Sequence, residues 1–453
     1  MRRWACQCSG ARIIALPRST TRRPADAKPS LYPPIAYALA VWAFGAGLYL
    51  IGFFQRVAPA VITHELMAEF VLSAVALGNL SALYFYAYVA VQIPTGVLVD
   101  HWGPRRVLTT GALVAAVGTL LFAASTAYGL VGLGRLLIGA GVGVAFVSML
   151  KLATHWVRPS RFALVSGLAL ACGSLGGISA GVPLRLAVDA FGWRWVMGSA
   201  GAMTALLAVA TWFIVRDDPQ DRGFRSYSTV AAADRGHHSM LGGIAEVFRH
   251  SNVWLNFIGC GAITGPMLAF GGLWGVPFLV SQYGLSTASA AFVTSVMLVA
   301  WAVASPLAGL LSDALRRRKL PILAGGSVAV VLWSVLIYRP GLPYWGLIAL
   351  MIGLGIASGV VVIGFAFCKE SAPPVLAGTA SGVANMGNML GGMAMQPLIG
   401  WLLDRAWDGR MVGEVREYSF AAYSHGFTLM LVWLVAGLAA FACTRETHAK
   451  QAA

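Results

Sequence analysis

Long apolar runs separated by short polar turns make up most of this chain of 453 residues. Each run is about 20 residues long, which is the length that an α-helix needs to cross the hydrocarbon core of a bilayer. Alternating ten-residue segments, the pattern of a membrane β-barrel, are not the repeating unit. Because no water in the bilayer core can satisfy backbone groups, runs of this kind must be helical. We therefore expect an all-α membrane protein with twelve transmembrane helices, at 36–62, 74–99, 107–126, 128–152, 162–186, 194–215, 253–282, 288–312, 321–338, 343–367, 376–403 and 421–443.

Polar segments divide the predicted helices into two groups of six. Residues 216–252 carry five arginines and five acidic residues without an apolar run, so they predict a cytoplasmic linker. It would join an N-terminal six-helix bundle at 35–215 to a C-terminal six-helix bundle at 253–443. Residues 1–34 are basic and contain proline, which predicts a disordered cytoplasmic tail; a targeting peptide is the alternative, because acidic residues are nearly absent. Residues 444–453 are expected to form a second cytoplasmic tail.

The composition excludes an ordinary soluble protein. Hydrophobic residues make up 58% of the chain and charged residues only 11%, against about 25% charged in soluble domains. The net charge of +15 does not indicate nucleic-acid binding, because its placement follows the predicted topology. Twenty-two Lys or Arg residues fall in the tails and loops on one side, and six fall on the other. By the positive-inside rule both termini should be cytoplasmic, and we expect the inner (plasma) membrane of a bacterium.

Matching motifs indicate that one unit was used twice. The motif GVLVDHWGPRR at 96–106 returns as GLLSDALRRRK at 309–319, with the leading glycine and the aspartate each displaced by 213 positions. A Ser-Gly pair, a Gly-Gly pair and an aspartate of the fifth predicted span recur 215 positions later, so that Ser166, Gly176 and Asp189 match Ser381, Gly391 and Asp404. Repeated halves with a solute site between them near the middle of the bilayer are typical of secondary transporters.

The repeated motif resembles the loop between spans 2 and 3, and between spans 8 and 9, of the major facilitator superfamily. The resemblance covers residues 35–443 and implies two pseudo-symmetric six-helix bundles that rock about a central site. This sequence has His101 where the family more often has Arg or Lys, and its second copy lacks the later glycine. The branches that it resembles most are the bacterial sugar-phosphate permeases and the lysosomal dipeptide transporters.

Gating residues are expected in the same motifs, because an aspartate can accept hydrogen bonds from helix N-terminal amides or from arginines. The residues that we expect to latch the cytoplasmic side in the outward-open state are Asp100, Arg105, Arg106, Asp313 and Arg316. The sequence RLLIGAG at 135–141 resembles the family's span-4 motif, whose arginine has been tied to proton handling or to salt bridges between spans. Arg135 is therefore a further gating candidate. Hydrogen bonding of Arg135 to carbonyls of span 1 or span 2 is the structural alternative.

Arg56 is the strongest candidate for a solute contact. A cation inside a span costs about 2.5–3.5 kcal/mol on insertion scales, so it should face a cavity or a partner. The resemblance adds to this, because organic-phosphate and organic-anion porters of the superfamily carry a substrate-binding arginine at the matching place. Their second arginine, in span 7, has no counterpart here, since the position 213 residues further on is Ala269. The alternative is that Arg56 reaches the headgroups or bonds to carbonyls near Pro59.

The acidic residues favour an anionic or zwitterionic solute. None of the 17 lies near the middle of a predicted span, although proton-coupled carriers usually need a carboxylate or histidine there. A solute with its own carboxylate or phosphate would complement the cations of the cavity. The polar residues that we expect to line the cavity beside Arg56 are Tyr84, Tyr88, Asn256, Asn385 and Asn388. A lipid-interface belt for the tyrosines and hydrogen bonding between helices for the asparagines are the alternatives.

The sequence predicts a secondary transporter that moves a small organic anion, amino acid or peptide by alternating access. A multidrug-type proton antiporter remains an alternative, since the glycines and Pro183 of the fifth span loosely resemble a drug-antiporter motif. A non-transporting membrane sensor is a second alternative, which the lack of loops long enough for a signalling domain disfavours. An enzyme is not expected, because the sequence has no nucleophile–base pair, metal cluster or phosphate-cradling loop. The expected partners are a small-molecule solute and the lipid bilayer, without nucleic acid or cofactor, and the expected state is a monomer.

Overall fold

The structure, a computed structural model, describes residues 31–158, 161–227, 246–373 and 376–449. Most of the predicted N-terminal tail, part of the predicted linker and the last residues of the C-terminal tail lie outside the described residues. Helices account for nearly all of the described chain, together with one short hairpin. This confirms the predicted all-α fold class.

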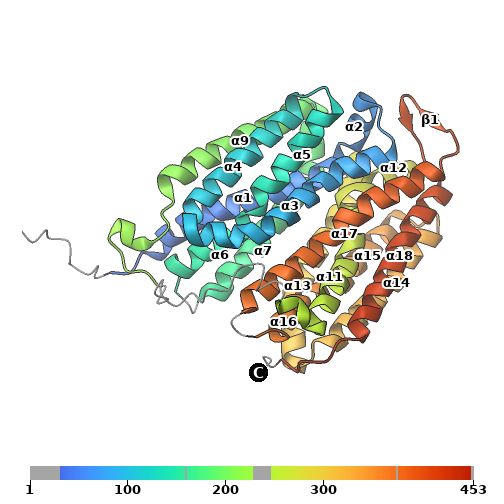
Figure 1. Ribbon diagram of the computed structural model, residues 1–453. Helices are drawn as coiled ribbons and strands as arrows, with labels where there is room; N and C mark the ends of the chain where they lie inside the picture. Colours follow the sequence, from blue (N-terminus) through green and yellow to red (C-terminus); the bar gives the residue numbers. More distant parts are fainter. Residues whose placement is uncertain (1–30, 159–160, 228–245, 374–375, 450–453) are drawn as a thin grey trace, which may run out of the picture.

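The first part of the chain forms a helical bundle, called here the N-terminal half, which runs from blue to green in Figure 1. Its helices begin at residues suited to a first turn. Ser73 caps α3 by accepting a hydrogen bond from the N–H of Ala76, and α4 begins at Pro104, whose missing N–H is harmless there. The elements are α1 (Ile35–Val61), α2 (Thr63–Phe70), α3 (Ala74–Trp102), α4 (Pro104–Ala124), α5 (Tyr128–Gly143), α6 (Ala145–Trp156), α7 (Phe162–Ser179), α8 (Val182–Phe191), α9 (Trp193–Ile214) and the short 3-10 helix η2 (Pro219–Arg222).

The second part forms the C-terminal half, which runs from yellow-green to red in Figure 1. It contains a π-helix, η4, a 3-10 turn, η5, and a two-stranded antiparallel hairpin in which Met411 pairs with Arg416. The elements are α11 (Ser251–Ala269), η4 (Phe270–Trp274), α12 (Gly275–Tyr283), α13 (Thr287–Leu315), α14 (Lys319–Tyr338), α15 (Tyr344–Ser358), η5 (Gly359–Val362), α16 (Ile363–Glu370), α17 (Ala377–Arg405), β1 (Met411–Val412), β2 (Val415–Arg416) and α18 (Phe420–Ala442).

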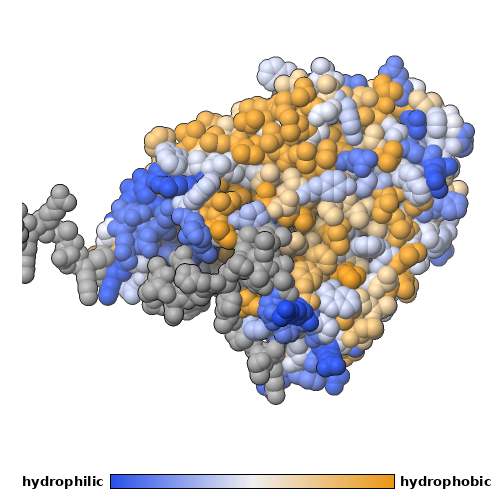
Figure 2. Space-filling view, viewed as in Figure 1, coloured by the Kyte–Doolittle hydropathy of each residue, from blue (hydrophilic) through white to orange (hydrophobic). Residues whose placement is uncertain are grey.

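A broad hydrophobic belt covers the face of the molecule seen in Figure 2, with hydrophilic residues gathered toward both ends. Among the described residues, ten helices are long and apolar enough to cross a membrane, and the bent pair α7–α8 makes an eleventh. The predicted span 376–403 corresponds to α17, which has 29 residues but is not one of these apolar helices. Its asparagines, glycines and Gln396 lower its hydropathy, so α17 is the polar member of the twelve predicted spans.

Two predicted spans are interrupted where the sequence weakens the helical hydrogen bonding. The span predicted at 162–186 bends by 40° between α7 and α8. Gly181 has non-helical backbone angles at this bend, and Pro183 has no N–H to donate. The span predicted at 253–282 contains the π-helix η4, one turn after Pro266. Because π-helical turns occur frequently at functional sites, the second interruption draws attention to the middle of this span.

The two halves meet tightly where α3 begins and α17 ends, a region called here the closed end. A Cβ atom added at Gly400 would lie 2.4 Å from the carbonyl oxygen of Ala74, and one added at Gly78 would lie 2.6 Å from a backbone oxygen of α17. Only glycine allows backbones to approach so closely. At the opposite ends of the same helices, called here the open end, a Cβ at Gly96 or Gly382 would meet no atom within 4 Å. Figure 1 shows the halves converging near α2 and β1 and diverging toward α6 and α16.

Candidate solute site and gating clusters

Arg56 lies inside a cage of aromatic rings contributed by α1 and α3. Only 4% of its surface is exposed. Its guanidinium carbon lies 4.2 Å from the ring centre of Phe53, 5.3 Å from Tyr88, 5.5 Å from Tyr84 and 5.9 Å from Phe85. One terminal nitrogen donates a long hydrogen bond of 3.5 Å to the hydroxyl of Tyr84, which itself donates to a backbone carbonyl of α1 at 3.1 Å. Desolvated cation–π contacts are worth about 2 kcal/mol, so the rings offset part of the cost of burying the cation.

The local sequence explains why these side chains meet. Tyr84 and Tyr88 are four residues apart and therefore share one face of α3. Glycines then let the neighbouring helices come close. A Cβ at Gly139 of α5 would lie 2.1 Å from the carbonyl oxygen of Tyr84, and a Cβ at Gly52 of α1 would lie 3.0 Å from the Val142 side chain of α5. Small residues thus bring α1, α3 and α5 together around the cation.

Arg135 is also buried, with 1% of its surface exposed, but its donors are used by the backbone. One terminal nitrogen donates to the Gln55 carbonyl at 2.7 Å and the other to the Ser81 carbonyl at 3.3 Å. The Gln55 carbonyl lacks its usual helical donor, because the residue four positions later is Pro59, which has no N–H. Arg135 therefore ties α5 to α1 and α3, the arrangement that the structural alternative anticipated. Its place as a gating residue stays a prediction.

The two buried arginines differ in the donors that they leave unused. Within the described part of the chain, neither takes part in a salt bridge, and the Nε of each has no hydrogen-bond partner. Both terminal nitrogens of Arg135 are bonded, whereas Arg56 has only the long bond to Tyr84. Two like charges close together in a medium of low dielectric raise the potential of the site. Such a potential attracts an anion, and Arg56 has more unused donors than Arg135 with which to bind one.

The three predicted asparagines have different surroundings. Asn256 is fully buried, and its Nδ2 donates to the Gly364 carbonyl at 2.8 Å, so it joins α11 to α16. Asn388 of α17 is 5% exposed, and its Oδ1 has no partner among the described residues. Asn385 lies one turn earlier on α17 and is half-buried. Asn256 therefore makes the hydrogen bond between helices that packing predicts. In α17, the Oδ1 of Asn388 has no partner among the described residues, and Asn385 is partly exposed.

The motif at 96–106 is held within the N-terminal half. Asp100, at the end of α3, accepts a hydrogen bond from Lys151 of α6 at 2.8 Å. The side chain of Arg105 donates to the Trp212 carbonyl at 2.9 Å, and its backbone N–H donates to Asp217 at 2.6 Å. Burial raises the pKa of Asp217, although the hydrogen bond from the Arg105 N–H opposes the change. Arg106 is exposed on α4.

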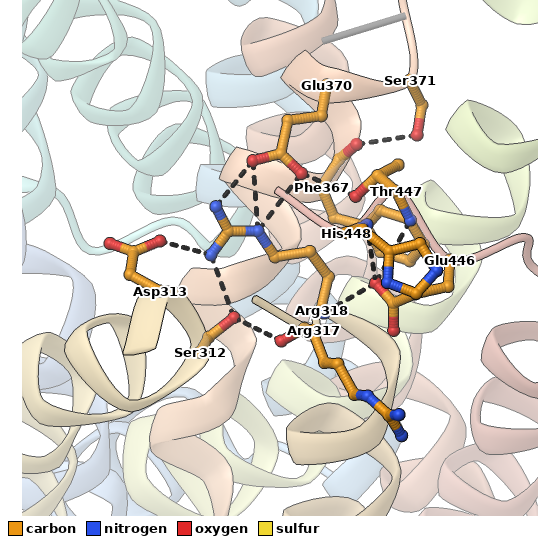
Figure 3. Close-up of polar contacts among 10 residues, drawn as sticks. All are labelled: Ser312, Asp313, Arg317, Arg318, Phe367, Glu370, Ser371, Glu446, Thr447 and His448. Atoms are coloured by element: carbon orange, nitrogen blue, oxygen red, sulfur yellow. Dashed lines mark hydrogen bonds and ion pairs between the residues drawn. The ribbon is translucent and has the colours of Figure 1, made fainter. Parts of the chain in front are cut away.

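The motif at 309–319 forms a denser network around Arg318, drawn in Figure 3. Arg318 donates to Asp313 at 2.5 Å and to Glu370 at 2.6 Å, and hydrogen bonding to Glu370 raises the pKa of Arg318. Glu446 accepts hydrogen bonds from the backbone N–H groups of Arg318, which precedes α14, and Lys319, its first residue, at 2.8 and 3.0 Å. Arg316 ends α13 in the left-handed region, with φ of 50°. The network therefore centres on Arg318, two residues beyond the arginine that the sequence indicated.

Sequence reasoning did not identify several of these partners. Lys151 and Glu370 lie at span ends, where charged residues are common and carry little signal. Arg318 is the third of three consecutive arginines in the motif, and nothing in the sequence distinguishes it from its neighbours. The sequence marks Asp404 only as the repeat of Asp189, whereas the structure shows it bonded to the other half at the closed end. The internal repeat indicates a shared role for Asp189 and Asp404 but does not show which of the two bonds to the other half.

A cavity of about 880 Å³ lies away from Arg56, between α7–α8 and α13 with η5 and the second half of α15. Aliphatic and aromatic side chains line it, including Ile178, Phe292 and Leu307. Without a charged lining residue, it is not suited to binding an anion.

Comparisons with known proteins agree with this architecture. A family model described as the Major Facilitator Superfamily matches residues 37–395. The chain is 24% identical over 387 residues to the probable sulfoacetate transporter of Cupriavidus necator, covering 79% of this chain and 85% of the relative. It is 27% identical over 275 residues to the lysosomal dipeptide transporter MFSD1 of Danio rerio, covering 56% of this chain and 57% of the relative.

Among solved structures, the fold is similar to a bacterial homolog of the human lysosomal transporter Spinster in an inward-facing, unoccupied conformation. The TM-score is 0.72 and the sequence identity 17%, and the match covers 90% of this chain and 97% of that chain. The matched family model, the helical fold and the apolar spans lead to one assignment. The chain is a multi-pass membrane transporter, not an enzyme, and it belongs to the major facilitator superfamily.

Proposed function

We propose that this transporter carries a small organic solute with at least one negative charge, either an organic anion or a zwitterion such as an amino acid or peptide. The observation that carries the proposal is Arg56, a buried cation with unused donors and no acidic partner among the described residues. A carboxylate, sulfonate or phosphate would supply the missing charge and accept two hydrogen bonds from one guanidinium. The relatives whose names mention sulfoacetate and dipeptides support the same classes of solute.

Aromatic residues beside Arg56 would complete the solute site. Tyr88 and Phe53 flank the guanidinium, so the bound anion would lie against their rings. Asn385 and Asn388, on α17 of the opposite half, are proposed to contact the rest of the solute. Asn388 supports this role because its buried Oδ1 lacks a partner among the described residues. A donor on the solute, such as an ammonium or hydroxyl group, would satisfy that oxygen.

We further propose that the two motifs control access on the side of the chain termini. The basic tails and loops support placing this side in the cytoplasm, in a bacterial inner membrane. In that orientation the open end faces the cytoplasm. Asp100 and Asp313 now bond within their own halves, to Lys151 and Arg318. Closing the open end would bring the two motifs together, and Asp100, Arg105 and Arg106 are proposed to exchange partners at that stage.

Uptake by purified protein in liposomes tests the role of Arg56. The panel should contain sulfoacetate, a sugar acid, an amino acid and a dipeptide, each labelled. We expect Arg56→Ala to abolish uptake of the transported compound and Arg56→Lys to raise its KM, because lysine keeps the charge but not the two-pronged geometry. Arg339→Ala, which removes an exposed arginine after α14, is the matched control and should behave as wild type. Wild-type uptake by Arg56→Ala would refute the proposed site.

A further inference from the structure

One carboxylate crosses between the two halves at the closed end. Asp404, near the last turn of α17, accepts hydrogen bonds from the backbone N–H groups of Ala74 and Val75, at 3.1 and 2.8 Å. Ala74 and Val75 are the first two residues of α3, and they lie 330 and 329 residues before Asp404 in the chain. The hydroxyl of Tyr418 donates to Asp404 at 2.7 Å and accepts from the Ala74 N–H at 3.1 Å. Arg416 adds an ion pair to Asp404 at 3.2 Å.

The contact combines two favourable interactions. The first N–H groups of a helix have no partner within the helix, so a carboxylate that accepts from two of them satisfies groups that would otherwise stay free. The same position carries the positive end of the helix dipole, which attracts a negative charge. Ser73 accepts from the N–H of Ala76, the third residue of α3. The start of α3 is therefore capped by Ser73 of its own half and by Asp404 and Tyr418 of the other half.

The internal repeat provides a comparison within the same molecule. The counterpart of Asp404 is Asp189, 215 positions earlier, and the counterpart of Ala74 is Thr287, the first residue of α13, 213 positions later. Asp189 bonds to Arg185 of its own helix instead, and its side chain is 52% exposed. The start of α13 is capped by its own Ser286. Of the two matching aspartates, Asp404 is the one that bonds to the opposite half.

We propose that Asp404 is the latch residue of the closed end, and that it holds the two halves together in the conformation described here. Gly78 and Gly400 allow the backbones of α3 and α17 to come close together. The Asp404 carboxylate stabilises this contact by accepting hydrogen bonds from the N–H groups of α3. For the closed end to open, the N–H groups of Ala74 and Val75 must leave the carboxylate and be hydrated. Asp404 thus sets the balance between conformations without touching the solute.

Distances between spin labels at the two ends test this latch. One pair joins Val71, after α2, to Val412 of β1 across the closed end; the other joins Trp102 of α3 to Leu320 of α14 across the open end, all four side chains being exposed. Native cysteines that react with the label are replaced by serine first. We expect Asp404→Asn to lengthen the closed-end distance, shorten the open-end distance and shift the ratio of the two conformations by about tenfold, because the amide loses the charge that strengthens both hydrogen bonds.

Asp189→Asn is the matched control, since it removes the same charge at the matching position and should leave both distances as in wild type. Asp404→Glu should retain most of the closed population, because it restores the negative charge. Tyr418→Phe should produce a smaller shift in the same direction, and it decides the question if Asp404→Asn does not fold. Unchanged distances in Asp404→Asn, or in Tyr418→Phe in its place, or an equal shift in Asp189→Asn, would overturn the proposal. The readout is conformational, so the result does not depend on whether Arg56 binds an anion.

Discussion

The bond from Arg135 to the Gln55 carbonyl should be coupled energetically to Pro59. Pro59 removes the N–H that would normally bond to this carbonyl in α1, and Arg135 supplies a replacement from α5 at 2.7 Å. Arg135→Met would leave the Gln55 and Ser81 carbonyls without these donors. Pro59→Ala would restore a helical N–H four residues after Gln55. The same carbonyl would then have a donor whether or not Arg135 is present.

The expected magnitude follows from the two distances. Hydrogen bonds between membrane helices average about 0.6 kcal/mol and reach about 1.7 kcal/mol. The bond to Gln55, at 2.7 Å, belongs near the upper value, and the bond to Ser81, at 3.3 Å, near the lower one. Arg135→Met should therefore lower the free energy of unfolding by about 1–3 kcal/mol in the wild-type background. In the Pro59→Ala background the loss should be smaller by about 1 kcal/mol.

Reversible unfolding of all four proteins in mixed detergent micelles measures this coupling. The double-mutant cycle compares the effect of Arg135→Met with proline and with alanine at position 59. A coupling of about 1 kcal/mol would support the role assigned to Arg135, because residues that share one acceptor are not additive. Effects that add within about 0.3 kcal/mol would refute it, since the arginine would then not be substituting for the missing N–H.

Two further predictions concern helix contacts. Gly400→Val should force α3 and α17 apart, because its Cβ would lie 2.4 Å from the Ala74 carbonyl oxygen. Gly96→Ala is the control, since its Cβ would meet no atom within 4 Å. The closed-end spin-label distance should lengthen in Gly400→Val and stay unchanged in Gly96→Ala. Burial alone would raise the pKa of Glu446, but the backbone N–H groups that it accepts from outweigh burial and hold the pKa below its ordinary value of 4.5. A lowered carboxyl pKa stabilises the fold above the unfolded-state value, and the contribution is lost as the pH falls through the folded-state value. Glu446→Gln should therefore have a lower free energy of unfolding than wild type at pH 7. The difference in free energy of unfolding between the two proteins should shrink on acidification below pH 4.5, and a difference that does not change with pH would contradict the assigned hydrogen bonding.

Much of the helical architecture was predictable, because apolar runs of membrane length permit few alternatives. The interruptions were less predictable, since each depends on where a freed backbone group finds a partner. Pro59 leaves α1 continuous because Arg135 bonds to the freed carbonyl. Pro183, next to the non-helical Gly181, accompanies a bend of 40°. Hydropathy also underrates α17, because its Gln396 is buried within the protein and donates to the Leu268 carbonyl at 3.0 Å.

Part of the candidate site was also predictable from the sequence. Arg56 is predictable because a cation inside a membrane span is unusual and because the family resemblance gives it a role, and Tyr84 and Tyr88 are predictable from their four-residue spacing. The structure brings these three side chains together. The partner of a charge at a span end is not fixed by spacing, because several loops meet there. Arg318 rather than Arg316 bonds to Asp313 for this reason. The different partners of Asp404 and Asp189 are partly visible in the sequence, since Arg185 lies four residues before Asp189 whereas Gly400 lies four residues before Asp404.

The central claim, that Arg56 binds the negative charge of the solute, is tested most directly by ligand-dependent stabilisation of purified protein. A compound at 100 times its dissociation constant stabilises the folded state by about 2.7 kcal/mol. Sulfoacetate, sugar acids, amino acids and dipeptides should be compared with uncharged analogues of the same size on wild type and Arg56→Ala. We predict that an anionic or zwitterionic compound raises the unfolding temperature of wild type, that its uncharged analogue does not, and that Arg56→Ala loses the response. An equal response in Arg56→Ala would contradict the claim.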